Sequence, residues 1–235
     1  MPIGNRPLLE YWLQTLYQSG ISNVVVNLHH YAEKVEQFLQ RPIFRDWVKL
    51  FYEEALLGTA GTLLANKSNF QDCTILLVHA DNWCQCDFDE FLNYHHNHRP
   101  KHCLMTMMTF ESPTPKTCGI VETDSEGVVF NFYEKSNNPP LNQANGAVYL
   151  LEPEVLKWIE KNPDITDFST EVLPYFMGHI ATWKNYGIHR DIGAVAMLKL
   201  AQSDPQPTSC WPQVDLWQKE FLSNPIHQQI AQSAD

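Results

Sequence analysis

Basic residues are scarce in this sequence. The chain has 16 Lys and Arg against 27 Asp and Glu, and its formal net charge is −11. Surfaces that bind nucleic acid hold phosphate backbones with clustered Lys and Arg, and no basic run occurs here. The charge balance therefore argues against a nucleic-acid partner. A polyanionic substrate would need local cations or a metal ion.

Long apolar runs are also missing. No stretch approaches the roughly 20 residues that a membrane-spanning helix needs, and the N-terminus lacks the basic and apolar regions of a signal peptide. These absences predict a cytoplasmic protein without a membrane partner. The six cysteines are scattered through a chain of 235 residues, which is too long to depend on a disulfide framework. Reduced thiols are therefore expected.

The remaining sequence predicts an α/β protein. With 44% hydrophobic residues, the chain can bury one sizeable core. Periodicity and capping signals place helices at 8–20, 31–39, 87–94, 153–161 and 169–177, and one ending near 202. Strands are expected at 21–28, 73–79, 103–110, 147–151 and 186–189. This alternation implies a largely parallel sheet flanked by helices, with 119–122 and 128–134 as a small antiparallel insertion.

The prolines Pro205, Pro207 and Pro212 mark a change in character near the C-terminus. They favour an extended tail with one short helix. We therefore expect one domain over residues 1–203 and a tail over 204–235.

Asp81 follows an apolar strand directly, and Asn82 is its neighbour. The carboxyl ends of parallel strands are where open α/β sheets bind ligands, and a carboxylate there suits a hard divalent cation that also holds phosphates. Asp191 lies at a second strand-to-helix junction, so the two aspartates can share one magnesium ion. Alternatively, each carboxylate forms a turn or caps the following helix. Both interpretations stay open.

Three further segments are candidates for substrate contacts. Gly58, Thr59, Ala60 and Gly61 form a short loop whose glycines would let backbone amides approach a base or a phosphate. Glu134 and Lys135 end the second inserted strand. There the carboxylate can bind a sugar hydroxyl and the ammonium can bind a phosphate. Asn145 and Gly146 precede a strand. Ordinary turns and a solvated charge pair are the alternatives.

The histidines and the close cysteine pair do not match a metal site. His95, His96, His98 and His102 lie on a polar segment whose spacing fits no zinc pattern. Cys84 and Cys86 are separated by one residue, which is neither a redox pair nor half a zinc ribbon. We interpret both groups as structural.

Read in order, these segments resemble the sugar-phosphate nucleotidyltransferase family, which includes mannose-1-phosphate guanylyltransferases and glucose-1-phosphate thymidylyltransferases. The resemblance covers residues 1 to about 201. Its motifs are Met1-Pro-Ile-Gly-Asn-Arg-Pro-Leu-Leu-Glu, Leu57-Gly-Thr-Ala-Gly, His79-Ala-Asp-Asn, Glu134-Lys, Asn145-Gly-Ala-Val-Tyr and Asp191-Ile-Gly. They are specific through their combination and order.

The resemblance implies a Rossmann-like fold of the nucleotide-diphospho-sugar transferase type and roles for the candidate residues. Asp81 and Asp191 would hold Mg²⁺, and Gly58 to Gly61 would line the nucleotide pocket. Glu134 and Asn145 would contact the sugar, with Lys135 on its phosphate. The substrates would be a nucleoside triphosphate and a sugar 1-phosphate, and the product would serve nucleotide-sugar and polysaccharide biosynthesis. The base, the sugar and a homo-oligomeric state are left open.

The sequence departs from the family pattern at its start. The first strand, the glycine-rich loop that cradles the triphosphate and the Pro-Lys pair have no counterpart here. A late start codon and a truncation both explain this, and an in-frame glycine-rich segment with Arg and Pro-Lys upstream of Met1 would support membership of the family. Without the strand, apolar strand edges would be open, and the activity of the 235-residue form is in question. Ala194 and Val195 also replace a common Thr-Pro.

Two other functions are compatible with the motifs. A non-catalytic remnant would bind a sugar nucleotide or a partner subunit without releasing pyrophosphate. A glycosyltransferase of similar architecture would also use an aspartate and a metal at a strand end, but it would yield a nucleoside diphosphate and a glycoside. The products of the reaction therefore distinguish the three.

Overall fold

The computed structural model describes residues 1–211 and 215–232, which fall into two compact units. The first unit comprises Met1–Glu54, Ala80–Cys84 and Arg190–Asp235. The second unit comprises Ala55–His79 and Gln85–His189. The chain passes between the units at β6 (Asn82–Gln85) and β12 (Ile188–Asp191), which form a two-stranded sheet.

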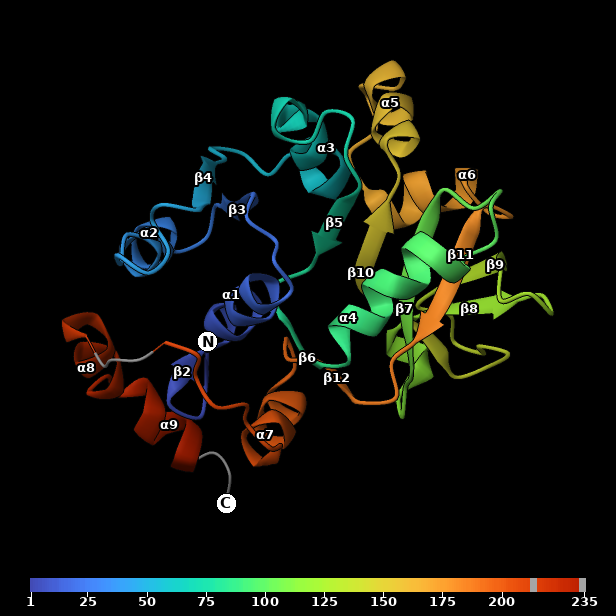
Figure 1. Ribbon diagram of the computed structural model, residues 1–235. Coiled ribbons are helices and arrows are strands. Elements are labelled where there is room, and N and C mark those ends of the chain that lie inside the picture. The colour runs from blue at the N-terminus through green and yellow to red at the C-terminus, as the bar shows by residue number, and fades with distance from the viewer. Residues whose placement is uncertain (212–214, 233–235) are drawn as a thin grey trace. The chain divides into compact units, whose positions relative to one another are not determined.

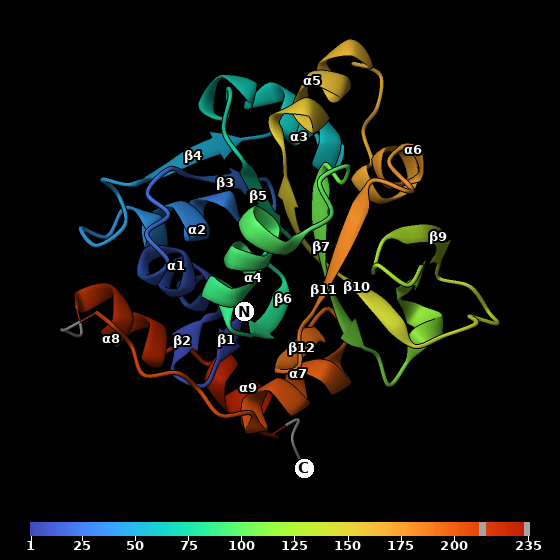
Figure 2. The same cartoon turned by 45° about the vertical axis from the view of Figure 1, so that its right-hand side comes forward.

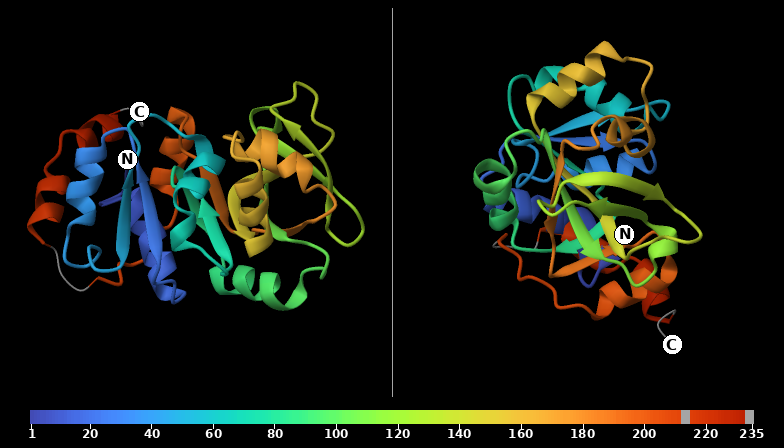
Figure 3. Two further views of the ribbon diagram at one scale, coloured as in Figure 1. Left: turned by 90° about the horizontal axis from the view of Figure 1, so that it is seen from above. Right: turned by 90° about the vertical axis from the view of Figure 1, so that its right-hand side faces the viewer.

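The first unit is built on a parallel pair of strands. Its elements are β1 (Pro2–Ile3), β2 (Arg6–Pro7), α1 (Leu8–Gln18), β3 (Val24–Leu28), α2 (Ala32–Leu39), β4 (Val48–Tyr52), α7 (Val195–Ser203), α8 (Leu216–Leu222) and α9 (Ile226–Gln232). β3 and β4 lie side by side in register from Val24↔Val48 to Leu28↔Tyr52 (Figure 3). Strand β4 is absent from the sequence-based prediction, because its alternation is short and interrupted by Lys49.

Helix α1 confirms the amphipathic helix expected at the start of the chain. Pro7 has an extended backbone (ψ 144°) and precedes the first helical residue. Leu8, Leu13 and Leu16 recur at helical spacing and are buried. The predicted apolar face is therefore the one that enters the core of this unit.

The C-terminal segment contains two short helices, where the sequence predicted one. Asp215 caps α8, because its Oδ1 accepts a hydrogen bond from the Gln218 backbone N–H at 2.8 Å. Trp217 and Phe221 stack one turn apart, with ring centroids separated by 5.1 Å. The cap and the stacked aromatic pair thus stabilise a helix in a segment where the nearby prolines favour an extended chain.

The second unit holds a six-stranded sheet with helices packed against it. Its elements are α3 (Gly58–Ala65), β5 (Ile75–Val78), α4 (Phe88–Asn93), β7 (Met105–Glu111), β8 (Gly119–Thr123), β9 (Val129–Glu134), β10 (Gln143–Leu151), α5 (Pro153–Lys161), α6 (Leu173–Tyr175) and β11 (Ile180–Lys184). Single turns of 3-10 helix lie at Lys67–Asn69 and Pro115–Thr117, and π-helical turns at Tyr94–His98 and Phe168–Val172. The strand order is β11-β7-β10-β8-β9, with β5 paired to β10 (Figure 1).

The α/β class is confirmed, and the sheet of this unit is mixed. β11 runs parallel to β7, whereas β10 is antiparallel to β5, β7 and β8. The antiparallel share is larger than predicted because β10 re-enters the sheet after the β8–β9 hairpin and runs against its neighbours. That hairpin is the predicted antiparallel insertion. β11 is absent from the prediction, since a five-residue segment with Thr and Lys carries little strand signal.

Several capping predictions are confirmed in this unit. The Asp87 carboxylate accepts from the Glu90 N–H at 2.9 Å and starts α4, and Asp167 accepts from the Thr170 N–H at 2.7 Å. Helix α5 has the predicted bounds, with Pro153 at its first turn. It packs beside α3 (Figure 2).

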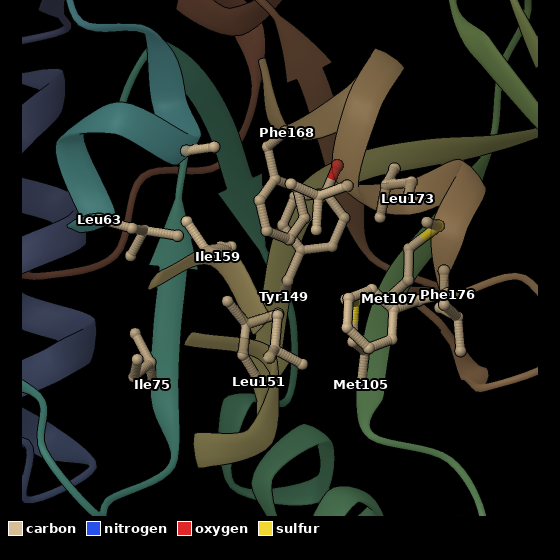
Figure 4. Packing of buried hydrophobic residues seen from close by; sticks show 14 of the residues in the cluster. Leu63, Ile75, Met105, Met107, Tyr149, Leu151, Ile159, Phe168, Leu173 and Phe176 are labelled. Atoms are coloured by element: carbon tan, nitrogen blue, oxygen red, sulfur yellow. The ribbon is translucent and has the colours of Figure 1, made fainter. Parts of the chain in front are cut away.

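The core of the second unit lies between the sheet and these helices. Met105 and Met107 of β7 and Tyr149 and Leu151 of β10 point toward Phe168 and its neighbours (Figure 4). Because Tyr149 is fully buried here, its hydroxyl must find a polar partner inside the unit.

Among the described residues, β3 pairs with β4 alone and β5 with β10 alone. Within residues 1–211 and 215–232, every helix is too short or too polar to cross a bilayer. All six cysteines are free thiols, as predicted.

Candidate active site

Asp81 lies in the turn between β5 and β6, and its side chain is exposed. A strand, not a helix, follows it, so the helix-capping alternative for Asp81 is wrong. Asn82 begins β6 and is buried, and its carbonyl accepts a hydrogen bond from the Trp12 indole at 2.8 Å. The backbone beside Asp81 is therefore anchored while its carboxylate faces solvent.

Asp191 ends β12 and is also exposed. Its Oδ1 accepts a hydrogen bond from the Gly193 N–H at 2.9 Å, which forms a local turn. The residue before α7 is Ala194, and no side chain caps that helix. The carboxylate of Asp191 therefore shapes the turn that leads to the helix, and its Oδ2 receives no hydrogen bond among the described residues.

The first unit brings these two strand ends together. The Ile192 N–H donates to the Asp81 carbonyl at 3.4 Å, and β6 and β12 pair with each other. Two exposed carboxylates on adjacent strand ends are a donor set that suits Mg²⁺, which takes one or two carboxylates and completes its shell with water and substrate phosphates. No group of three or more His, Cys, Asp or Glu suited to a metal occurs in the described part of the chain. Magnesium binding by Asp81 and Asp191 stays a prediction.

The predicted glycine loop at Gly58–Gly61 is the first turn of helix α3, which corrects the sequence analysis. Helical geometry follows because Ala60 is buried and its N–H donates to the Thr166 carbonyl at 2.9 Å. Gly58 has a φ of +75°, and a Cβ there would collide with that carbonyl. Thr59 and Gly61 follow it in the same turn.

Asn145 and Gly146 lie inside β10, not ahead of it, which is a second correction. The register of β10 against β7 shifts between Asn145 and Tyr149. The Asn145 Oδ1 accepts from the Ala147 N–H at 2.9 Å, so a side chain satisfies a backbone group within the irregular part of the ladder. Ala147 has a φ of +51°, a strained value for a residue with a side chain.

Glu134 ends strand β9 as predicted, Lys135 follows it directly, and both side chains are exposed. The Lys135 Nζ lies 3.9 Å from the Glu134 Oε1. An exposed pair at this distance contributes little to stability, so both charges are available to a ligand. Lys135 also has a positive φ of 45°, and its N–H donates to the Cys118 carbonyl at 3.2 Å.

Tyr149 links the candidate residues of the second unit. Its hydroxyl accepts a hydrogen bond from the Asn145 Nδ2 at 2.6 Å. Burial is the largest cause that raises the pKa of Tyr149, and the charges of Glu134 and Asp167 raise it further, against the hydrogen bonds from Asn145 and Ser169. The neutral phenol therefore holds the Asn145 amide in one orientation.

Asp167 adds a fixed negative charge to this cluster. Burial alone would raise its pKa, but hydrogen bonds from Thr170 and Ser169 and the nearby charge of His79 lower the pKa overall. The backbone carbonyl of its neighbour, Thr166, accepts the hydrogen bond from the Ala60 N–H in the first turn of α3. Sequence reasoning missed Thr166, because a backbone carbonyl leaves no signal in the residue type.

The predicted site residues thus form two clusters. Asp81, Asn82 and Asp191 belong to the first unit, and all the others belong to the second. In the second unit, the Thr166 carbonyl accepts a hydrogen bond from the start of α3, and the Tyr149 hydroxyl accepts one from Asn145.

Several solved structures share this fold. A structure from Bacillus anthracis, provisionally assigned as a glucose-1-phosphate thymidylyltransferase and in complex with sucrose, has a TM-score of 0.76 and 16% identity and covers 89% of this chain and 87% of its own. HddC from Yersinia pseudotuberculosis, complexed with GMP-PN, has a TM-score of 0.72 and 19% identity, with 86% and 87% covered. At these identities, the likeness establishes the fold.

Curated relatives extend the similarity to sequence. The mannose-1-phosphate guanylyltransferase catalytic subunit beta of Drosophila pseudoobscura pseudoobscura is 28% identical over 199 aligned residues, with 80% of this chain and 52% of the relative covered. The UTP–glucose-1-phosphate uridylyltransferase of Synechocystis is 27% identical over 198 residues, with 74% and 48% covered. The chain spans about half the length of the curated relatives it matches.

A sequence profile described as nucleotidyl transferase matches residues 1–204, which is most of the chain. The profile covers both strand ends of the first unit and the whole second unit. The chain therefore belongs to the nucleotidyl transferase family, as the order of its motifs predicts.

Proposed function

We propose that this protein takes part in the synthesis of a nucleotide sugar from a nucleoside triphosphate and a sugar 1-phosphate. In this reaction a phosphate oxygen of the sugar 1-phosphate attacks the α-phosphorus of the triphosphate. A new P–O bond forms, the bond to the β-phosphate breaks, and pyrophosphate leaves. The observation that carries the proposal is the pairing of the strand ends that bear Asp81 and Asp191, in a chain of this family.

Magnesium is the cation that suits these carboxylates best. Asp81 and Asp191 are exposed, so each keeps carboxylate oxygen that can bind a hard cation. When bound, the ion neutralises phosphate charge and aligns the two substrates for in-line transfer. The Trp12–Asn82 hydrogen bond and the Asp191–Gly193 turn keep the protein ligands in place before the substrates arrive.

The family resemblance implies sugar-phosphate contacts for three candidate residues of the second unit. The Asn145 amide is held at both ends, by the Ala147 N–H and the Tyr149 hydroxyl, and keeps one donor and one acceptor site for a sugar hydroxyl. Glu134 contacts another hydroxyl. Lys135 contacts the phosphate as a compact, flexible charge. The α3 turn at Gly58–Gly61 offers backbone to the nucleotide.

GTP and mannose 1-phosphate are the substrates we propose first. The Drosophila pseudoobscura pseudoobscura relative is named for guanylyl transfer to mannose 1-phosphate. The Synechocystis relative is named for UTP and glucose 1-phosphate, so that pair is the main competitor. A homo-oligomer and a cytoplasmic location remain predictions.

A pyrophosphate-release assay tests the proposal. The purified 235-residue chain, and the product extended by any in-frame codons upstream of Met1, are incubated with Mg²⁺ and a panel of triphosphates and sugar 1-phosphates. We expect release that needs magnesium and falls at least 100-fold in Asp81→Ala and Asp191→Ala, as the loss of a group that stabilises transition-state charge predicts. Sugar-nucleotide binding that needs no magnesium, without release by either form, would refute the proposal and favour a non-catalytic binding protein.

A further inference from the structure

Asp204 follows the last residue of α7, and both oxygens of its carboxylate are used. Its Oδ2 accepts a hydrogen bond from the Trp83 indole N–H at 2.9 Å and another from the Arg190 Nε at 2.6 Å. Its Oδ1 accepts from the Arg190 Nη2 at 2.7 Å. All three residues belong to the first unit. One carboxylate therefore joins two chain segments that are far apart in sequence.

The partners of Asp204 flank the two proposed magnesium ligands. Trp83 lies two residues after Asp81, and Arg190 lies directly before Asp191. Trp83 is fully buried, so its side chain cannot move away to find another acceptor. Arg190 binds through two parallel N–H groups, which fixes orientation as well as distance. The Asp204 carboxylate thus restrains the backbone immediately beside each ligand.

The burial of this cluster favours a structural carboxylate over a metal ligand. The side chain of Asp204 is 10% exposed and that of Arg190 is 25% exposed. With one arginine and one indole already bound, the carboxylate has little room or charge left for a cation. Its role is to act through Trp83 and Arg190.

We propose that Asp204 is a positioning residue for the divalent-cation site of Asp81 and Asp191. This inference rests on the proposed function. The Ile192–Asp81 hydrogen bond joins the strand ends through the backbone, but its 3.4 Å length marks it as a weak link. Asp204 supplies the stronger, charged connection. Loss of that connection lets the two carboxylates separate and weakens cation binding without removing a ligand.

The structure offers a closely matched control. Asp215 also lies in the C-terminal segment of the first unit, and its Oδ2 accepts a hydrogen bond from the Arg41 Nε at 2.6 Å. Like Arg190 and Asp204, these two residues form a hydrogen-bonded ion pair. Arg41, however, contacts Glu10 and the aromatic rings of Phe38, Phe44 and Trp217, and none of these residues belongs to β6 or β12.

The experiment measures Mn²⁺ binding to the full chain by electron paramagnetic resonance, since Mn²⁺ shares the oxygen ligands and octahedral geometry of Mg²⁺. We expect Asp204→Asn to weaken Mn²⁺ binding about 10-fold, the lower end of what loss of an outer-shell partner costs. Trp83→Phe removes one hydrogen bond and keeps the apolar ring, so about a 3-fold loss is expected. Asp215→Asn should bind as the wild type does.

The outcomes separate this inference from the proposed function. If the wild type binds Mn²⁺ and Asp81→Ala and Asp191→Ala do not, the cation site stands. Unchanged affinity in Asp204→Asn, or an equal loss in Asp215→Asn, would then overturn the positioning role alone. If the wild type does not bind Mn²⁺, both proposals fall. Near-ultraviolet circular dichroism checks the fold, and if Asp204→Asn unfolds, an unchanged affinity in folded Trp83→Phe overturns the role.

Discussion

Removal of the Tyr149 hydroxyl is the most specific test of the candidate residues in the second unit. Tyr149 is fully buried, and its hydroxyl receives the Asn145 amide at 2.6 Å. The substitution Tyr149→Phe keeps the ring and its packing against Phe168 and removes the hydroxyl that bonds Asn145 and Ser169. The variant therefore isolates the contribution of one hydroxyl.

The expected loss in the free energy of unfolding depends on the Asn145 amide donor that is left without its acceptor. A buried donor left unpaired costs about 1–3 kcal/mol, but Asn145 is only partly buried and can reach water, so we expect about 1–2 kcal/mol. For a chain of this size, that lowers the unfolding temperature by roughly 2–8 °C. If Asn145 orients the sugar, its lost restraint also raises the KM for the sugar 1-phosphate about 5-fold, the equivalent of about 1 kcal/mol of binding.

Differential scanning calorimetry measures the first effect, and steady-state kinetics with varied sugar 1-phosphate measures the second. Tyr133→Phe is the control, because that hydroxyl likewise accepts a hydrogen bond from an asparagine, Asn131, and donates one to Glu122, but all three residues are only partly buried. Its unfolding temperature should stay at the wild-type value. A Tyr149→Phe variant as stable as the wild type would show that the hydroxyl does not hold Asn145. A stability loss with an unchanged KM would instead refute the sugar contact.

Three further predictions concern the second unit. Gly187→Ala should fold poorly or melt well below the wild type in calorimetry, because its Cβ would collide with the backbone carbonyl of Gln85. Burial lowers the pKa of His95 from 6.5 to about 3, so the unfolded state binds the extra proton. The free energy of unfolding should reach its full value above pH 6.5 and fall by about 1.4 kcal/mol per pH unit as the pH drops toward 3. Urea titrations should show this slope for the wild type, and His95→Gln should flatten it. Burial raises the pKa of the Cys103 thiol to about 11. Iodoacetamide at pH 8, followed by mass spectrometry, should therefore label exposed Cys73 long before Cys103, and equal labelling would contradict the burial.

Local signals account for the elements that the sequence predicts correctly. Helix α5 has a proline at its start and an apolar face of Val155, Leu156 and Ile159, so its pattern and its bounds agree. Caps at Asp87 and Asp167 are similarly local, because each carboxylate bonds an N–H three residues ahead. Such features need no information from the rest of the chain.

Tertiary contacts account for what the sequence does not reveal. β11 is a strand because β7 pairs with it in parallel from Ile180↔Met105 to Lys184↔Thr109, and five mixed residues alone do not signal that partner. The turn at Gly58 becomes helical through the distant Thr166 carbonyl. In both places, a distant partner decides between structures that are equally compatible with the local sequence.

The candidate site shows the same division. Asp81 and Asp191 can be proposed as ligands from the sequence alone, because each is expected at the end of a strand, and the structure places Asp81 just after β5 and Asp191 at the end of β12. Asp204 is not predictable, because its partner Trp83 lies 121 residues away and nothing near Asp204 indicates the contact. Residue type and position suggest a ligand, whereas the groups that orient it emerge only from the fold.

The most direct test of the central claim is the product itself. Phosphorus NMR follows the sugar phosphate as it is consumed in a reaction with GTP, mannose 1-phosphate and Mg²⁺. The reaction is run with the 235-residue chain and with the product extended by any in-frame codons upstream of Met1. We predict two new diphosphate resonances and a pyrophosphate signal, all of which need magnesium and disappear in Asp81→Ala and Asp191→Ala. Retention of both substrates across the full substrate panel, or the same products from the Asp81→Ala variant, would contradict the account.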